Sequence, residues 1–201
     1  MQSINETPKA TPMRPATPDE FDRAYRAPLT FWGDFRVPKE LKALAEMRSD
    51  QRSLELGCGV GRFSRYLAQQ GLRATAVDFS PVAISKAREA CARDDAPPDF
   101  SVGDVTHLQR LSGPFDFAFD VGCFHCLGTQ QQKAYVGEVF RLLKRGGIHL
   151  IWALDSSPSE ISLSPNVVRA VFAPQFELQA AETSRRRLAR SHWYWLRRAA
   201  Q

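Results

Sequence analysis

The sequence predicts an α/β fold: a doubly wound, mostly parallel sheet of seven strands with helices on both faces and an antiparallel hairpin at its C-terminal end. Strand-like apolar runs alternate with helix-like patterns between residues 50 and 155, and alternating β and α units build parallel sheets. The last two strand patterns, near 176–182 and 191–197, are joined by a connection too short for a helical crossover, so they should pair antiparallel. A length of 201 residues suits one domain.

Local signals set the boundaries of the elements. Ser80 and Pro81 start a helix, because serine caps a helix and proline suits its first turn. Gly71 ends one helix and the glycine pair at 146–147 ends another. In chain order we predict a helix at 39–48, a strand at 52–56, a helix at 60–70, a strand at 72–78, a helix from 81, strands at 100–102 and 115–122, a helix at 129–145, a strand at 148–155, a helix near 165–172, and strands near 176–182 and 191–197.

Composition narrows the classes of protein. No apolar run approaches the roughly 18 residues of a membrane span, and the N-terminus has no apolar signal core. The four cysteines show no secreted disulfide pattern, and Cys123 and Cys126 form a single pair without a second pair at zinc spacing. We therefore expect a cytoplasmic protein with reduced thiols and no metal. The net charge of +5 includes an arginine-rich stretch at 185–198, which we interpret as a solvated rim.

The most informative stretch is the glycine-rich turn after the first predicted strand. Gly57, Gly59 and Gly61 follow Glu55 at alternate positions, and a helical pattern begins at once. Such a turn lets backbone approach a ligand at the open end of a parallel sheet. Asp78 closes the next strand, where a carboxylate can accept hydrogen bonds from ribose hydroxyls. Together these residues predict a site for a nucleoside-bearing cofactor.

The spacing of the glycines favours one kind of cofactor. Dinucleotide enzymes use G-x-G-x-x-G to hold a pyrophosphate at a helix N-terminus, whereas this turn reads G-x-G-x-G. Glu55 stands two residues before the first glycine. A carboxylate there would repel a pyrophosphate but suits a ligand that carries an ammonium group.

With these residues the chain resembles the class I S-adenosylmethionine-dependent methyltransferases. The resemblance spans roughly residues 50–155 and is carried by E-L-G-C-G-V-G-R at 55–62, the acidic strand end at Asp78, the Gly103-Asp104 pair, and the F-D-x-x-x-D run at 115–120. It implies a Rossmann-like methyltransferase fold and S-adenosyl-L-methionine as cofactor, with S-adenosyl-L-homocysteine as product. The aromatic N-terminal segment and the closing HWYWLRR strand are loosely similar to compact small-molecule members, including the thiopurine/thiol group.

The resemblance also implies a role for each matching residue. The glycine turn, with Cys58 inside it, would pass beneath the methionine and ribose parts of the cofactor. Glu55 would orient that turn and the amino group, and Asp78 would take the ribose hydroxyls. The remaining positions would contact the adenine or line the channel near the sulfonium: Asp104 on the adenine amino group, Val105 and Phe79 on the adenine ring, and Asp120 and Gly122 along the channel.

Each of these positions also has a purely structural interpretation. The glycines could form only a tight turn between strand and helix. Asp78 could act as a capping residue ahead of Pro81, Asp104 could be a turn residue after Gly103, and Asp120 could simply end a strand.

Two further groups are candidates on the acceptor side. His125 follows Asp120 by five positions and titrates near neutrality, so it is a candidate general base for a nucleophile that must lose a proton; it could equally fix the loop. Phe31, Trp32 and Phe35 could form a lid over cofactor and substrate, or only anchor the first helix. Cys123 and Cys126 are expected to be small buried groups.

These candidates define the expected division of the chain. Residues 1–18 hold four prolines and almost no large apolar groups, so we expect disorder there. Residues 19–201 would form one methyltransferase domain: a cap or lid at 19–49, the cofactor-binding core at 50–155, and the C-terminal helix and strand pair at 156–201.

The function predicted from these observations is transfer of a methyl group to an S, O or N atom of a small molecule by in-line displacement. The alternatives are an RNA or protein methyltransferase, which only the arginine-rich C-terminus supports, and a non-catalytic S-adenosylmethionine-binding protein. A nicotinamide oxidoreductase is a more distant alternative. We expect a small-molecule acceptor rather than nucleic acid, no membrane partner, and a monomer or homodimer.

Overall fold

The computed structural model describes residues 17–27, 36–46, 51–155, 161–186 and 189–200. Within these ranges one seven-stranded sheet forms in the order β3-β2-β1-β4-β5-β7-β6. The strands are β1 (Arg52–Leu56), β2 (Arg73–Asp78), β3 (Asp99–Val102), β4 (Phe115–Val121), β5 (Leu143–Leu154), β6 (Phe176–Arg186) and β7 (Ala189–Arg198).

The sheet has a parallel part and an antiparallel edge, as predicted. Strands β1 to β5 pair in parallel, and β7 lies antiparallel between β5 and β6. The strand order reverses at β1, which has β2 on one side and β4 on the other. In open α/β sheets, ligands bind beyond the carboxyl ends of the strands at such a reversal.

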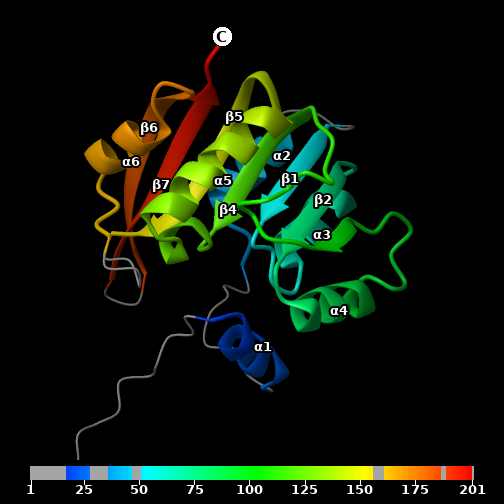
Figure 1. Ribbon diagram of the computed structural model, residues 1–201. Coiled ribbons are helices and arrows are strands. Elements are labelled where there is room, and N and C mark those ends of the chain that lie inside the picture. Colours follow the sequence, from blue (N-terminus) through cyan, green and yellow to red (C-terminus); the bar gives the residue numbers. More distant parts are fainter. Residues whose placement is uncertain (1–16, 28–35, 47–50, 156–160, 187–188, 201) are drawn as a thin grey trace, which may run out of the picture.

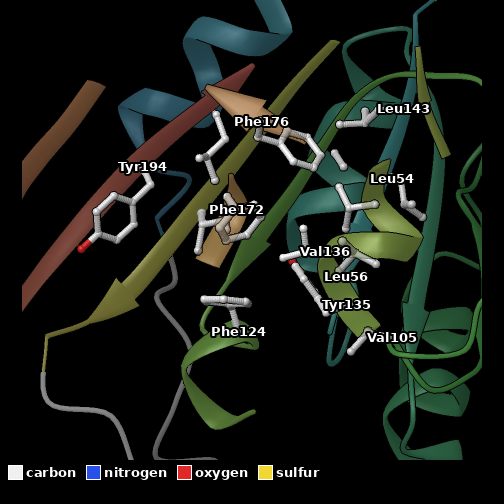
Figure 2. Packing of buried hydrophobic residues seen from close by; sticks show 14 of the residues in the cluster. Leu54, Leu56, Val105, Phe124, Tyr135, Val136, Leu143, Phe172, Phe176 and Tyr194 are labelled. Atoms are coloured by element: carbon white, nitrogen blue, oxygen red, sulfur yellow. The ribbon is translucent and has the colours of Figure 1, made fainter. Parts of the chain in front are cut away.

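Helices cover both faces of the sheet (Figure 1). One face carries α5 (Thr129–Leu142) and α6 (Pro165–Phe172), whose apolar residues join β4, β5 and β7 in one cluster. Part of this cluster is drawn in Figure 2. A second cluster joins α2 (Lys39–Glu46) and α3 (Arg62–Gln69) to the same strands. Helix α4 (Pro81–Ala90) packs its buried stripe with Cys91 and Phe100 in a smaller third cluster.

The first helix, α1 (Pro18–Arg26), is absent from the sequence prediction. Thr17 caps it, since its hydroxyl accepts a hydrogen bond from the Glu20 amide while the Glu20 carboxylate accepts one from the Thr17 amide. Disorder is predicted for 1–18, but Thr17 is the cap and Pro18 the first residue of this helix, so the prediction is wrong for these two residues. Residues 1–16 lie outside the described part. In Figure 1, α1 lies beyond the end of the sheet to which the arrow of β1 points.

The predicted end of the helix at 129–145 is wrong. Helix α5 ends at Leu142, and Leu143 is already extended, with φ −77° and ψ 151°. Leu143 pairs with Phe115 at the start of β4 and is fully buried. This strand pairing outweighs the helix-stop signal of the following glycines, so residues 144–147 belong to β5.

Candidate cofactor site

Three buried carboxylates converge at the carboxyl ends of neighbouring strands. Glu55 lies near the end of β1, Asp78 ends β2, and Asp120 lies near the end of β4. Their exposed fractions are 2%, 3% and 0%. Because β1 pairs with both other strands, the three acids lie close enough for Asp78 and Asp120 to raise the pKa of Glu55 electrostatically.

Glu55 ties β1 to the helix that follows the glycine turn. Its Oε2 accepts hydrogen bonds from the Ser64 amide at 2.9 Å and from the Ser64 hydroxyl. Ser64 is in the first turn of α3, where free amides and the helix dipole favour a negative charge. Burial nevertheless raises the pKa of Glu55 to about 8. The predicted role in orienting the turn therefore has a geometric basis.

Asp78 holds the glycine turn from the next strand. Its Oδ2 accepts from the Gly59 amide at 2.7 Å, and its Oδ1 accepts from the Ser80 amide at 2.9 Å. Burial raises the pKa of Asp78 despite these two bonds. Each carboxylate oxygen has a second lone pair, so this anchoring leaves acceptor capacity for the expected ribose hydroxyls.

The glycine turn leaves no space for side chains. Gly57 has φ +70°, and a Cβ there would lie 2.5 Å from the Cβ of Cys123. Gly59 has φ +54°, and a Cβ there would lie 2.8 Å from the Tyr25 hydroxyl. At Gly61 the obstacle is the Phe100 ring, so packing against α4 and β3 explains that glycine. Cys58 is buried within the turn, and its pKa is raised by burial.

Asp120 organises the turn that follows β4. Its Oδ1 accepts from the Cys123 amide at 2.7 Å, and its Oδ2 accepts from the Phe124 amide at 2.6 Å. These amides begin the short 3₁₀ helix η1 (Phe124–Cys126). Burial raises the pKa of Asp120 to about 7. Gly122 is partly exposed, has φ +98°, and donates its amide to the Trp152 carbonyl at 3.1 Å.

The residues expected around the adenine ring lie in different surroundings. Asp104 is exposed, and its Oδ1 accepts from the amide and hydroxyl of Thr106 at 2.8 and 2.7 Å. Burial acts to raise the Asp104 pKa, but these hydrogen bonds and His107 lower it overall. Val105 is buried in the large core cluster. Phe79 is partly exposed and meets the ring of Phe21 edge to face, with ring centroids 5.3 Å apart.

His125 lies in η1 and is 7% exposed. Its ring stands nearly perpendicular to that of Trp152, with centroids 5.9 Å apart. Its Nδ1 accepts a long hydrogen bond, 3.4 Å, from the Leu154 amide. A neutral ring that accepts at Nδ1 carries its proton on Nε2. Acting as a base would require the ring to give up the Leu154 contact.

The predicted lid residues Phe31, Trp32 and Phe35 lie outside the described residues. Helix α1 instead covers the described part of the site. Tyr25 meets the glycine turn at Gly59, and the Ser80 hydroxyl donates to Asp22. Sequence reasoning missed this helix, although Phe21 and Tyr25 stand four residues apart, as on one helical face.

The charges of the site favour a ligand that carries positive charge. Every hydrogen bond that we find to the three buried carboxylates, among the described residues, comes from a neutral donor. Buried carboxylates without a cation raise each other's pKa and attract a cationic ligand. Packing of Cys123 and Tyr25 against Gly57 and Gly59 excludes a Cβ at both positions, so the turn requires glycine there. No group of acids, histidines and cysteines in the described ranges could hold a metal ion.

Comparison with known proteins agrees with this geometry. Residues 54–147 match the family described as "Methyltransferase domain". These residues therefore have the sequence and the fold of a methyltransferase domain. A solved structure of similar fold, magnesium protoporphyrin IX methyltransferase from Synechocystis PCC 6803, is described with bound S-adenosyl-L-methionine; it superposes with a TM-score of 0.69 at 18% identity and covers 89% of this chain. No helix among the described residues is long and apolar enough to cross a bilayer.

Relatives of the methyltransferase domain differ in their chemistry. The chain is 31% identical over 140 residues to an S-adenosyl-L-methionine-dependent Diels-Alderase from Talaromyces variabilis, covering 64% of this chain and 47% of the relative. It is 33% identical over 128 residues to malonyl-[acyl-carrier protein] O-methyltransferase from Pectobacterium atrosepticum, covering 62% and 47%. The chain spans about half to three fifths of the length of the curated relatives that it matches.

A solved structure extends the likeness to nearly the whole chain. N-methyltransferase NodS from Bradyrhizobium japonicum, in complex with S-adenosyl-L-homocysteine, superposes with a TM-score of 0.77 at 17% identity. The superposition covers 92% of this chain and 99% of NodS. It shows that the antiparallel β6–β7 edge and the methyltransferase domain form one shared fold.

Proposed function

We propose that the protein transfers the methyl group of S-adenosyl-L-methionine to an S, O or N atom of a small molecule by in-line displacement. The observation that carries this proposal is the group of three buried carboxylates, Glu55, Asp78 and Asp120, at the strand ends around a bare glycine turn. Among the described residues these acids meet only neutral donors, so a cationic donor would favour their ionised forms and be held by them.

The residues of the chain would act mainly by positioning and by excluding water. Glu55 and Asp78 fix the glycine turn from two strands, and Tyr25 covers that turn from α1. Asp120 fixes the turn that holds His125. When bound, S-adenosyl-L-methionine supplies an activated methyl group on a positively charged sulfur. Aligning an acceptor with such a group in a dry site lowers the barrier without a covalent intermediate.

We propose that His125 contacts the acceptor rather than only packing in its loop. Its position after Asp120 and its contact with Trp152 support this role. With its proton on Nε2, the ring would hold an acceptor oxygen, sulfur or nitrogen by donating a hydrogen bond. An acceptor that must be deprotonated would need the other arrangement of the ring, in which Nε2 accepts.

The direct test offers methyl-labelled cofactor to a panel of thiols, phenols, amines, carboxylates and tRNA. We expect label on a small molecule and none on tRNA. Label on tRNA alone, with binding that weakens steeply with salt, would instead support the RNA methyltransferase alternative.

A second candidate is a cofactor-dependent protein that does not transfer the methyl group. The likeness to an S-adenosyl-L-methionine-dependent Diels-Alderase favours this alternative. It predicts saturable cofactor binding with no S-adenosyl-L-homocysteine formed over the whole panel. Formation of S-adenosyl-L-homocysteine that depends on an added acceptor would exclude it.

We also propose a cytoplasmic location and a small-molecule partner. The free cysteines Cys58, Cys91, Cys123 and Cys126 support a reducing compartment. Of these, Cys126 is exposed and Cys123 is partly exposed, contrary to the expectation that both are buried. Whether the protein is a monomer or a homodimer stays a prediction that sedimentation would test.

A further inference from the structure

A chain of three buried polar side chains starts at Asp120 and runs away from the cofactor site into the core. The hydroxyl of Tyr135, on α5, donates to Asp120 Oδ2 at 3.1 Å. The same hydroxyl lies 3.0 Å from Nε2 of His149, on β5. All three residues are 0% exposed. The chain therefore joins β4, α5 and β5 behind the site.

The surroundings of this chain are apolar. The ring of His149 lies 6.0 Å from that of Phe172 and 6.3 Å from that of Phe176. The ring of Tyr135 lies 5.2 Å from that of Phe124, within the cluster drawn in Figure 2. Burying a hydroxyl and an imidazole costs free energy that hydrogen bonds only partly offset. Filling space is therefore a poor explanation for these two residues, since an apolar pair would do it better.

The directions of the hydrogen bonds determine how Tyr135 and His149 act on Asp120. Tyr135 has one proton and two partners. When it donates to Asp120, His149 must carry its proton on Nε2 and donate it to the Tyr135 oxygen. His149 Nδ1, which is buried and has no hydrogen-bond partner among the described residues, is then the unprotonated ring nitrogen. Asp120 then accepts three hydrogen bonds, two of them from the amides of Cys123 and Phe124. The carboxylate is thus fixed from the core side and holds the start of η1 on the site side.

We propose that Tyr135 and His149 are positioning residues for the turn at 122–126. They hold Asp120 as an acceptor, and Asp120 holds the turn that places His125 beside the cofactor site. This inference rests on the proposed function for its catalytic consequence, but its structural part is independent of any substrate.

The pKa of Asp120 provides a measurable test of the roles of Tyr135 and His149. The titratable groups that face Asp120 are Glu55 on β1, Cys123 in the turn and Tyr135 on α5. Burial raises the Asp120 pKa to about 7, and the Tyr135 hydrogen bond acts to lower it. Burial lowers the His149 pKa to about 3, so this ring stays neutral near pH 7. Removing the Tyr135 hydroxyl should therefore move the titration of Asp120 to higher pH.

The first experiment compares Tyr135→Phe with Tyr194→Phe. Tyr194 is also fully buried, but its hydroxyl donates to the Leu163 carbonyl, away from Asp120. Amide NMR signals of Cys123 and Phe124 are followed from pH 5 to 9 in both variants. We expect displaced signals and a higher midpoint in Tyr135→Phe alone. With an acceptor in hand, kcat should fall about five- to tenfold, the scale of one hydrogen bond, in Tyr135→Phe only.

The second experiment tests His149 through a double-mutant cycle. His149→Leu should displace the same two amides, and it should add nothing in the Tyr135→Phe background, because it acts through the tyrosine. Additive effects, or equal responses in Tyr135→Phe and Tyr194→Phe, would overturn the inference. Failure of the wild-type protein to bind S-adenosyl-L-homocysteine would instead overturn the proposed function, while the amide titrations would still decide the positioning roles.

Discussion

Strand β4 carries two aspartates four residues apart in opposite environments. Asp116, near its start, meets the Lys144 ammonium at 2.6 Å and the Arg52 amide at 2.8 Å. Burial acts to raise its pKa, but these partners lower it overall. Asp120, near the end, meets only neutral donors among the described residues, and burial raises its pKa to about 7. Asp116 has its cation within the protein, whereas Asp120 has none among the described residues, as our proposed function requires of an acid at a site for a cationic ligand.

The same contrast holds across the sheet. Glu55 and Asp78 share the carboxyl-end environment of Asp120 and its raised pKa. Asp94, which meets Arg65 at 2.6 Å, behaves like Asp116 and has a lowered pKa through that hydrogen bond. Three buried acids without a cation at one sheet end destabilise the ligand-free fold as the pH rises and they ionise. This is the expected cost of a site organised for a cationic ligand.

The largest expected effect comes from removing one site carboxylate. Asp78→Ala should weaken S-adenosyl-L-methionine binding by roughly 2–3 kcal/mol, the scale of hydrogen bonds to a charged acceptor. The variant removes the proposed acceptor for the ribose hydroxyls, and it leaves the Gly59 and Ser80 amides without their carboxylate partner. Asp116→Ala is the matched control and should change the dissociation constant less than about twofold. Calorimetric titration of both variants measures the dissociation constant. Equal losses of affinity in the two variants would contradict the proposal that only the acids at the carboxyl ends of the strands bind the cofactor.

An intermediate effect is expected in the pH dependence of stability. The pKa values of Glu55 and Asp120, about 8 and about 7, lie above those of the unfolded chain. The native state therefore holds extra protons between about pH 4.5 and 8, and the free energy of unfolding should fall as pH rises through that window. Each group contributes at most about 1.4 kcal/mol per pH unit.

Urea unfolding at pH 5, 6, 7 and 8 measures that decline. Asp120→Asn should flatten it, because the variant has no carboxylate to ionise there, whereas Asp116→Asn should leave the slope unchanged. A free energy of unfolding that rises from pH 5 to pH 8 would contradict the assignment of unneutralised buried acids.

The smallest effect is expected for the free energy of unfolding when Asp116 is changed. Asp116→Asn should lower the free energy of unfolding by about 0.5 kcal/mol, because the Asp116–Lys144 pair is partly exposed to solvent. The loss should shrink in 1 M salt, where exposed charges are screened. Thermal unfolding at low and high salt measures it. A loss that is unaffected by salt would mean that the pair is less exposed than its side-chain accessibility indicates.

Local sequence patterns were enough to predict most of the fold and the glycine turn. Apolar runs set the strands, and Ser80 and Pro81 fixed the start of α4 where the structure has it. The parallel order followed from alternation, and the C-terminal hairpin followed from a short connection. Glu55 and the turn glycines were recognisable because their spacing lies within one short segment.

What the sequence could not predict depends on contacts between distant segments. Leu143 pairs with Phe115, which overrides the helix stop after it. In the sequence, Tyr135 lies within a helical pattern and His149 lies within an apolar strand pattern. Neither pattern indicates a contact, and only the packing of α5 against β5 brings the two residues together. Tyr25 meets Gly59 only because α1 docks beyond the sheet end. The roles of Asp104, Val105 and Phe79 toward adenine stay predictions.

The central claim is that buried acids without cations around a bare glycine turn bind a positively charged nucleoside donor. Calorimetric titration of the wild-type protein with S-adenosyl-L-methionine at about pH 5.5 and about pH 8 tests it directly. We expect one saturable site, with binding several-fold tighter at the higher pH, because Glu55, Asp78 and Asp120 are more ionised there. No saturable binding at either pH, or tighter binding at the lower pH, would contradict it.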